Sequence, residues 1–244
     1  MTEDQVIKKL ISTASSEIGY MEKASNKNLD DKTANAGKGN FTKYARDLVN
    51  LIGSPYSQGA AWCDMFVDWC FIKTFGKDNA KKMLGGWSAY TPTSANFYKN
   101  SGRFFKTPSV GDQIFFKNSE RINHTGIVIN VTDTFVYTIE GNSSNKVQNR
   151  SYSLKDKSIA GYGKPDWSVV TTKEEPKTNQ WPLATVEGVD ISDVLNPNVF
   201  DVRKYRAAYA DLDSVFGDNW QMYYYHYKVI GKTEIETKQR PPFM

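Results

Sequence analysis

The spacing of apolar residues changes once along the chain, and this change constrains the fold more than any other feature. Residues 3–19 and the segments that begin at Phe41 and Cys63 have apolar spacings of three and four, as in helices with a buried face. From residue 110 the spacing becomes two, or short apolar runs separated by turn residues, which predicts strands. Because the helices precede the strands, we expect an α+β domain with helices packed on an antiparallel sheet.

After the strand pattern ends near Trp167, the chain changes character twice. Residues 168–189 have mixed charge, two prolines and no apolar period, which is typical of a linker. Residues 190–244 are rich in aromatic side chains and predict a second module, small and mainly helical. The length of 244 residues accommodates this module beside a full domain of residues 1–167.

Charge and hydropathy argue against two classes of partner. The 31 basic and 27 acidic residues leave a net charge of +4, too small a surplus to indicate nucleic-acid binding. Asp64 and Asp68 interrupt the longest apolar run, whereas a membrane helix needs about 20 apolar residues. The first residues, MTEDQVIKKLIS, show no signal peptide. We expect a soluble protein that is made in the cytoplasm and does not insert into membranes.

The chain has two cysteines, Cys63 and Cys70, in one predicted helix. Seven residues of helix separate them by about 10 Å, beyond the roughly 7 Å that a disulfide spans, so both are expected to be free thiols. Cys63 lies in the first helical turn, where unpaired N–H groups and the helix dipole favour a thiolate. Cys70 lies two turns deeper and is expected to be a core residue.

A cysteine nucleophile needs a general base that a third group orients, and the chain has only two histidines. His124 opens a predicted strand, and Gly126 leaves room beside it for a close approach. Glu140 and Asn142 end the next predicted strand. A hairpin that pairs residues 124–131 with 134–140 brings both side chains near His124, and either can accept the imidazole N–H.

Each of these residues also has a structural explanation when it is considered alone. A cysteine at a helix start can be a packing residue, a histidine at a strand edge can be an ordinary polar residue, and Glu-Gly-Asn is typical of a turn. Their joint order along the chain favours nucleophilic catalysis instead.

Five segments, in this order and spacing, resemble CHAP domains, the cysteine- and histidine-dependent amidohydrolases/peptidases: AWCDMFVDWC, PSVGDQIFF, HTGIVINV, TIEGNSSNKV and GYGKPDW. The resemblance covers residues 1–167 and implies a papain-like fold. It also implies that Cys63 is the nucleophile and His124 the general base and acid, with Glu140 and Asn142 orienting the imidazole. The family's reaction requires no cofactor.

Two features differ from the pattern of the family. Some members bind calcium in an acidic loop before the nucleophile, but the corresponding segment, SPYSQGAA, has no carboxylates, so no metal is expected there. Asp30 and Asp31, in an earlier polar loop, are expected to be solvated. Gln58 is a candidate oxyanion donor beside the backbone N–H of Cys63, although its spacing from the cysteine is not diagnostic.

Residues 199–239 resemble a short helical module of bacterial extracellular and wall-active proteins. His226 falls within this pattern and is expected to be a packing residue. Attachment to a wall polymer is a hypothesis that requires some of the aromatic side chains to be exposed for stacking on sugars.

The resemblance implies a peptidoglycan hydrolase that cleaves an amide bond, as an N-acetylmuramoyl-L-alanine amidase or as an endopeptidase of the stem peptide or cross-bridge. A phage or prophage endolysin fits the missing signal peptide, because holin-type release, or another export route, takes such enzymes to the wall. Two alternatives remain open: an inactive wall-binding module, and a papain-like protease or acyltransferase with a substrate outside the wall.

Overall fold

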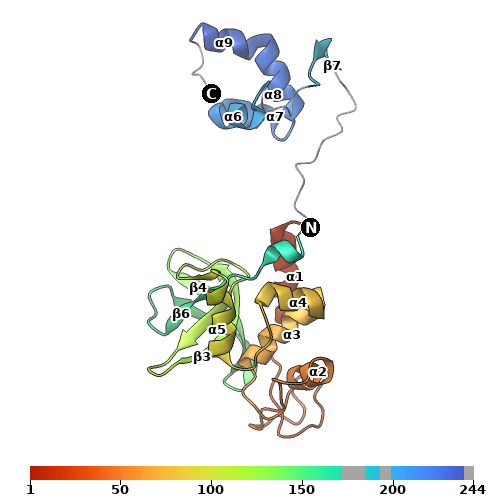
Figure 1. Ribbon diagram of the computed structural model, residues 1–244, viewed down its shortest axis with the longest axis vertical. Helices are drawn as coiled ribbons and strands as arrows, with labels where there is room; N and C mark the ends of the chain where they lie inside the picture. Colours follow the sequence, from red (N-terminus) through yellow and green to blue (C-terminus); the bar gives the residue numbers. More distant parts are fainter. Residues whose placement is uncertain (172–184, 193–198, 239–244) are drawn as a thin grey trace. The chain divides into compact units, whose positions relative to one another are not determined.

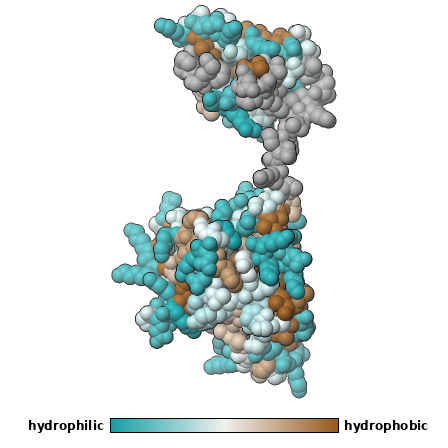
Figure 2. Space-filling view, viewed as in Figure 1, coloured by the Kyte–Doolittle hydropathy of each residue, from teal (hydrophilic) through white to brown (hydrophobic). Residues whose placement is uncertain are grey.

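The computed structural model describes residues 1–171, 185–192 and 199–238. The chain divides into two compact units, Met1–Glu174 and Glu175–Met244 (Figure 1). The visible surface of each unit is mostly hydrophilic, with small separate apolar areas (Figure 2). Within the described residues, no helix combines the length and apolar character needed to cross a membrane.

The first unit begins with helices, as the apolar spacing predicts. In chain order they are α1 (Glu3–Ser16), α2 (Lys43–Leu51), α3 (Cys63–Phe75), α4 (Lys77–Leu84) and α5 (Thr91–Asn100). Local sequence sets two of the starts, because the side chains of Thr2 and Thr42 accept hydrogen bonds from the first turns of α1 and α2. A 3-10 turn, η1 (Trp167–Val169), follows the last strand of this unit.

Six strands form one sheet in which every neighbouring pair is antiparallel. They are β1 (Phe104–Phe105), β2 (Gln113–Lys117), β3 (Ile122–Val131), β4 (Phe135–Ser143), β5 (Lys146–Ser153) and β6 (Ile159–Gly163), in the spatial order β1-β6-β2-β3-β4-β5. The predicted α+β class and the predicted hairpin are confirmed, since Ile127 faces Ile139 and Val128 faces Thr138 across β3 and β4.

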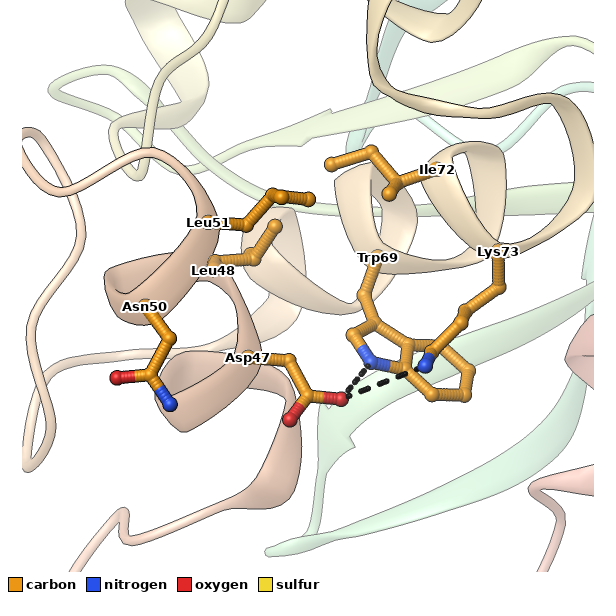
Figure 3. A pocket seen from close by; sticks show the side chains of 7 residues that line it. All are labelled: Asp47, Leu48, Asn50, Leu51, Trp69, Ile72 and Lys73. Atoms are coloured by element: carbon orange, nitrogen blue, oxygen red, sulfur yellow. Dashed lines mark hydrogen bonds and ion pairs between the residues drawn. The ribbon is translucent and has the colours of Figure 1, made fainter.

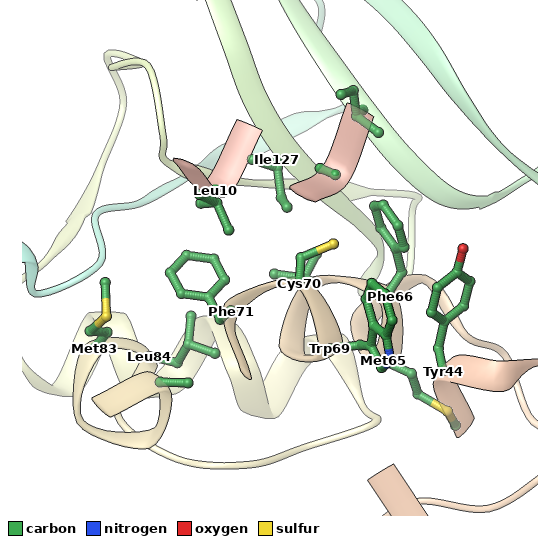
Figure 4. Close-up of a cluster of buried hydrophobic side chains, with 14 of the residues drawn as sticks. Leu10, Tyr44, Met65, Phe66, Trp69, Cys70, Phe71, Met83, Leu84 and Ile127 are labelled. Carbon is green, nitrogen blue, oxygen red and sulfur yellow. The ribbon is translucent and has the colours of Figure 1, made fainter. Parts of the chain in front are cut away.

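Helix α3 is the centre of the first unit. Every residue from Cys63 to Phe71 is buried, so this helix has no solvent face in its first nine positions. It packs against α1, α2 and α4 and against β3 and β4. Figure 4 shows its side chains Phe66, Cys70 and Phe71 in the main apolar cluster. Cys70 is fully buried there, as expected for a core residue.

The second unit has a small core of its own. Its described elements are β7 (Thr185–Val186), β8 (Val189–Asp190), α6 (Val202–Ala208), α7 (Ala210–Phe216), α8 (Trp220–His226), the π-helical turn η2 (Tyr227–Gly231) and α9 (Lys232–Glu236). Phe200 stacks on Tyr224 with ring centroids 4.7 Å apart. Residues 172–184 of the expected linker lie outside the described residues, whereas β7 and β8 pair within residues 185–190.

Gly141 allows β4 to approach α3 closely, which yields a first prediction. A Cβ at this position would lie 2.4 Å from Phe66 Cβ and 2.9 Å from Trp62 Cζ3. We expect Gly141→Ala to lower the free energy of unfolding by about 1–3 kcal/mol, measured by urea denaturation, because helix and strand must separate. Asn149→Ala, at an exposed position of β5, serves as the control and should cost about 0.5 kcal/mol or less. Equal costs at the two positions would contradict the assigned contact.

Candidate active site

Cys63 is the first residue of α3, at the end of the helix where backbone N–H groups lack helical partners. The preceding residue, Trp62, makes no side-chain cap, so these N–H groups stay available to a ligand. The Trp62 indole Nε1 instead donates to Glu22 Oε2 at 2.9 Å. Cys63 itself is 5% exposed, so its sulfur lies at the margin of the core and not deep within it.

His124, on β3, contacts both Cys63 and Glu140. Its Nε2 lies 2.9 Å from Glu140 Oε2, and Cys63 is close enough to the ring to raise the pKa of the imidazole. The Phe116 ring packs beside the imidazole, with centroids 5.7 Å apart. The structure therefore brings together three of the predicted site residues from three separate elements.

The electrostatic environment keeps the imidazole protonated at neutral pH. Burial by itself lowers the pKa of His124, but the hydrogen bonds and charges of Cys63 and Glu140 oppose burial and raise the pKa to about 10. The imidazolium is thus present below pH 10 and is lost as the pH rises through that value. A cysteine beside an imidazolium at a helix start is suited to nucleophilic attack followed by proton donation to a leaving group.

Asn142 lies near this group but forms a different contact. Its Nδ2 lies 3.5 Å from Asn40 Oδ1, in the loop that precedes α2. The pairing of β4 with β5 is irregular between Glu140 and Ser143, and Asn142 has a positive φ of 54°. This irregularity interrupts the regular alternation of side chains along β4 after Glu140. Of the two predicted acceptors, Glu140 is the one that binds the imidazole.

Gln58 connects its loop to the start of α2. Its Oε1 accepts from the backbone N–H of Thr42 and its Nε2 donates to the carbonyl of Thr42, both at 2.9 Å. These two hydrogen bonds hold the Gln58 side chain in place. They use one N–H of Nε2, and the other can donate to a ligand.

The acidic residues of the early loop have protein partners. Asp30 forms two hydrogen bonds of 2.7 Å with the Arg46 guanidinium, and Asp31 Oδ1 accepts from the backbone N–H groups of Thr33 and Ala34. In the part of the chain that the structure describes, no three His, Cys, Asp or Glu side chains gather as a metal site.

A separate cavity of about 320 Å³ lies between α2 and α3. Figure 3 shows its lining residues Asp47, Trp69 and Lys73 joined by polar contacts of the Asp47 carboxylate. None of the predicted site residues lines it, and it has no group that resembles a nucleophile with a base. The cavity therefore contains none of the candidate catalytic groups.

Sequence reasoning missed two hydroxyl groups that reach the carboxylate of Glu140. Thr138 Oγ1 lies 2.6 Å from Glu140 Oε1, and the Tyr152 hydroxyl lies 3.2 Å from Glu140 Oε2. Strand alternation alone could have placed Thr138 on the same face as Glu140. The contact of Tyr152 with Glu140 could be predicted only from the register of β4 and β5.

The role of Glu140 in the protonation of His124 can be tested directly. We expect Glu140→Gln to lower the pKa of His124 from about 10 toward the ordinary value near 6.5, because the carboxylate charge is lost. NMR titration of the imidazole signals measures this pKa. His226, in the second unit, is an internal control whose titration should be the same in both proteins. A His124 pKa that is unchanged in the variant would overturn the assignment.

Comparison with protein families gives a match to the CHAP domain over residues 55–142. The comparison with curated proteins found no match. The matched range contains Cys63, His124 and Glu140, and the resemblance found in the sequence is confirmed at the level of the family. A CHAP domain implies a peptidoglycan hydrolase with amidase or peptidase activity. Residues 55–142 are thus similar to a CHAP domain, and the α+β fold of the first unit is consistent with that family.

Proposed function

We propose that residues 1–167 form a catalytic domain that cleaves an amide bond of peptidoglycan, with Cys63 as nucleophile and His124 as general acid and base. The observation that supports this proposal most strongly is the continuous contact from Cys63 through His124 to Glu140. A nucleophile, a proton carrier and an orienting acid in mutual contact form the minimum set for acyl transfer through a covalent intermediate.

The proposed reaction has two steps. The Cys63 thiolate attacks the amide carbonyl carbon, and the C–N bond breaks as the His124 imidazolium gives its proton to the departing amine. Water then attacks the thioester, His124 takes a proton from that water, and the C–S bond breaks to return the thiolate and release the carboxylic acid. The backbone N–H of Cys63 and the remaining N–H of Gln58 Nε2 are proposed to stabilise the oxyanion.

The amide bond and the biological setting belong to the proposal as well. The two candidate bonds are the one between muramic acid and the first alanine, and one within the stem peptide or cross-bridge. Mass spectrometry of fragments from defined peptidoglycan distinguishes them, because each cleavage leaves a different new amine. We propose a phage or prophage endolysin that reaches the wall after holin-type release or by another export route.

The proposed mechanism predicts different roles for the two cysteines. We expect Cys63→Ala to abolish clearing of purified cell walls while binding to the walls, measured by sedimentation, persists. Cys70→Ser is the matched control. It places a hydroxyl in the fully buried position 70 and should lower the free energy of unfolding by about 1–3 kcal/mol, yet retain clearing. Clearing by the Cys63→Ala protein would refute the mechanism.

The alternatives give different results in the same assay. An inactive wall-binding module would sediment with walls but would not clear them in its natural sequence. A papain-like protease or acyltransferase would leave peptidoglycan intact and consume a peptide or thioester substrate.

The second unit is proposed to attach the enzyme to a wall polymer, with residues 168–189 as the linker and 190–244 as the binding module. Among its described residues, five aromatic side chains are buried and stabilise the module itself: Phe200, Tyr205, Tyr209, Tyr223 and Tyr224. His226 is also a packing residue, since its Nδ1 lies 2.9 Å from the Tyr205 hydroxyl. Trp220 and Tyr225 are partly exposed and are the rings proposed to stack on sugars, although Arg206 lies over the Trp220 ring and the Tyr225 hydroxyl donates to Glu187.

Removal of the second unit tests its role. A chain that ends at residue 174 retains the complete first unit and should keep its activity on soluble peptidoglycan fragments. We expect its sedimentation with intact walls, and its clearing of them at low enzyme concentration, to fall about tenfold or more, because binding through two modules is lost. Unchanged sedimentation would exclude a targeting role.

A further inference from the structure

The Glu140 carboxylate is fully buried, yet three donors from three strands converge on it. His124 on β3 and Tyr152 on β5 share Oε2 at 2.9 and 3.2 Å, while Thr138 on β4 reaches Oε1 at 2.6 Å. We propose that Thr138 and Tyr152 are positioning residues that hold the Glu140 carboxylate in place and keep it directed at His124. This inference rests on the proposed function, because it assigns these hydroxyls a part in the same reaction.

Burial makes this support necessary. A carboxylate without water takes up a proton unless hydrogen-bond donors stabilise its charge. Among the described residues, the only side chain that donates to Oε1 is Thr138, so its hydroxyl takes the place of water there. An ionised carboxylate only accepts, and both hydroxyls can donate, so the three contacts are compatible with the charged form.

The backbone around Glu140 is shaped to admit this side chain. Gly126, two residues after His124 on β3, has no Cβ, and a Cβ there would lie 2.5 Å from Glu140 Cγ. The Cβ and Cγ atoms of Glu140 thus fill the space beside Gly126. With these atoms held between β3 and Thr138, the carboxylate has little freedom to turn away from the imidazole.

Tyr152 is in turn held by its neighbours. Its ring packs on Phe116 with centroids 4.6 Å apart, and Arg150 Nε lies 3.5 Å from its hydroxyl. Burial raises the pKa of Tyr152 to about 12, so the phenol keeps its proton throughout the neutral range. It can therefore accept from Arg150 and donate to Glu140 at the same time. Phe116 contacts both Tyr152 and His124, which covers one side of the whole group.

The proposal predicts how the pH dependence of the site changes. Without the Thr138 hydroxyl, the Glu140 carboxylate is held less firmly against His124, and its contribution to the raised pKa of His124 becomes smaller. The imidazolium that favours the thiolate of a neighbouring cysteine is then less populated. The loss of one hydrogen bond to a charged group corresponds to a pKa shift of about one to two units.

The experiment measures alkylation of Cys63 by iodoacetamide as a function of pH in the full chain, with mass spectrometry to identify the modified thiol. We expect Thr138→Val to move the acid limb of this profile up by about one to two pH units, and Thr138→Ser to restore it. Tyr152→Phe should cause a smaller shift in the same direction, since His124 still donates to Oε2. This variant, at a half-buried position, provides the test if Thr138→Val does not fold.

The matched control is Thr125→Val. Thr125 is also a fully buried threonine of the sheet, but its hydroxyl donates to the Ile114 carbonyl and has no contact with Glu140. The Thr125→Val protein should have a lower free energy of unfolding, but the pH profile of its Cys63 alkylation should not shift. An unshifted profile in folded Thr138→Val and Tyr152→Phe proteins, or an equal shift in Thr125→Val, would overturn the proposal.

Alkylation does not require hydrolysis, so the two proposals can fail separately. A shifted profile in an enzyme that leaves walls intact would reject the proposed function and keep the roles of Thr138 and Tyr152. Efficient wall clearing with an unshifted profile would support the proposed function and reject the roles of Thr138 and Tyr152.

Discussion

The burial of α3 is the constraint on which the rest of the first unit depends. A helix without a solvent-exposed face in its first nine residues must lie between other elements, and α1, α2, α4 and the sheet enclose it. Its first residue, Cys63, then meets the sheet where β3 and β4 carry His124 and Glu140. The same packing that stabilises the core thus determines which imidazole the sulfur contacts.

A buried polar network holds the first turn of α3 against the sheet. Asp64 accepts from Ser94 on α5 and from Gln113 on β2, and Gln113 also donates to Thr125, the neighbour of His124. Burial raises the pKa of Asp64 to about 7, although both donors oppose the shift. These bonds hold the first turn of α3 against α5 and β2.

Aromatic residues contribute to the cores of both units. In the first unit, Phe116 and Tyr152 also stand beside the proposed site. In the described part of the second unit, five of the eight buried core residues are aromatic: Phe200, Tyr205, Tyr209, Tyr223 and Tyr224. A module of this size has few aliphatic residues to bury, so large rings supply its apolar contact area. Its aromatic content is therefore mainly a requirement of folding, and only partly exposed rings are free for recognition.

Local patterns determined much of this protein. The change of apolar period predicted helices followed by antiparallel strands, and helix position separated Cys63 from the core residue Cys70. The order of cysteine, histidine and acid along the chain identified the candidate site before any coordinates. These features depend on residues close in sequence. The apolar periodicity and the signals at helix ends are therefore sufficient to predict them.

Only the tertiary structure decided the features that depend on register and on distant contacts. β6 inserts between β1 and β2, and the irregular pairing after Glu140 turns Asn142 toward Asn40 instead of the imidazole. The approach of Tyr152 to Glu140 likewise follows from the pairing of β4 with β5. A shift of one residue in a strand reverses which face each side chain occupies, and that choice is made by the packing of the whole sheet.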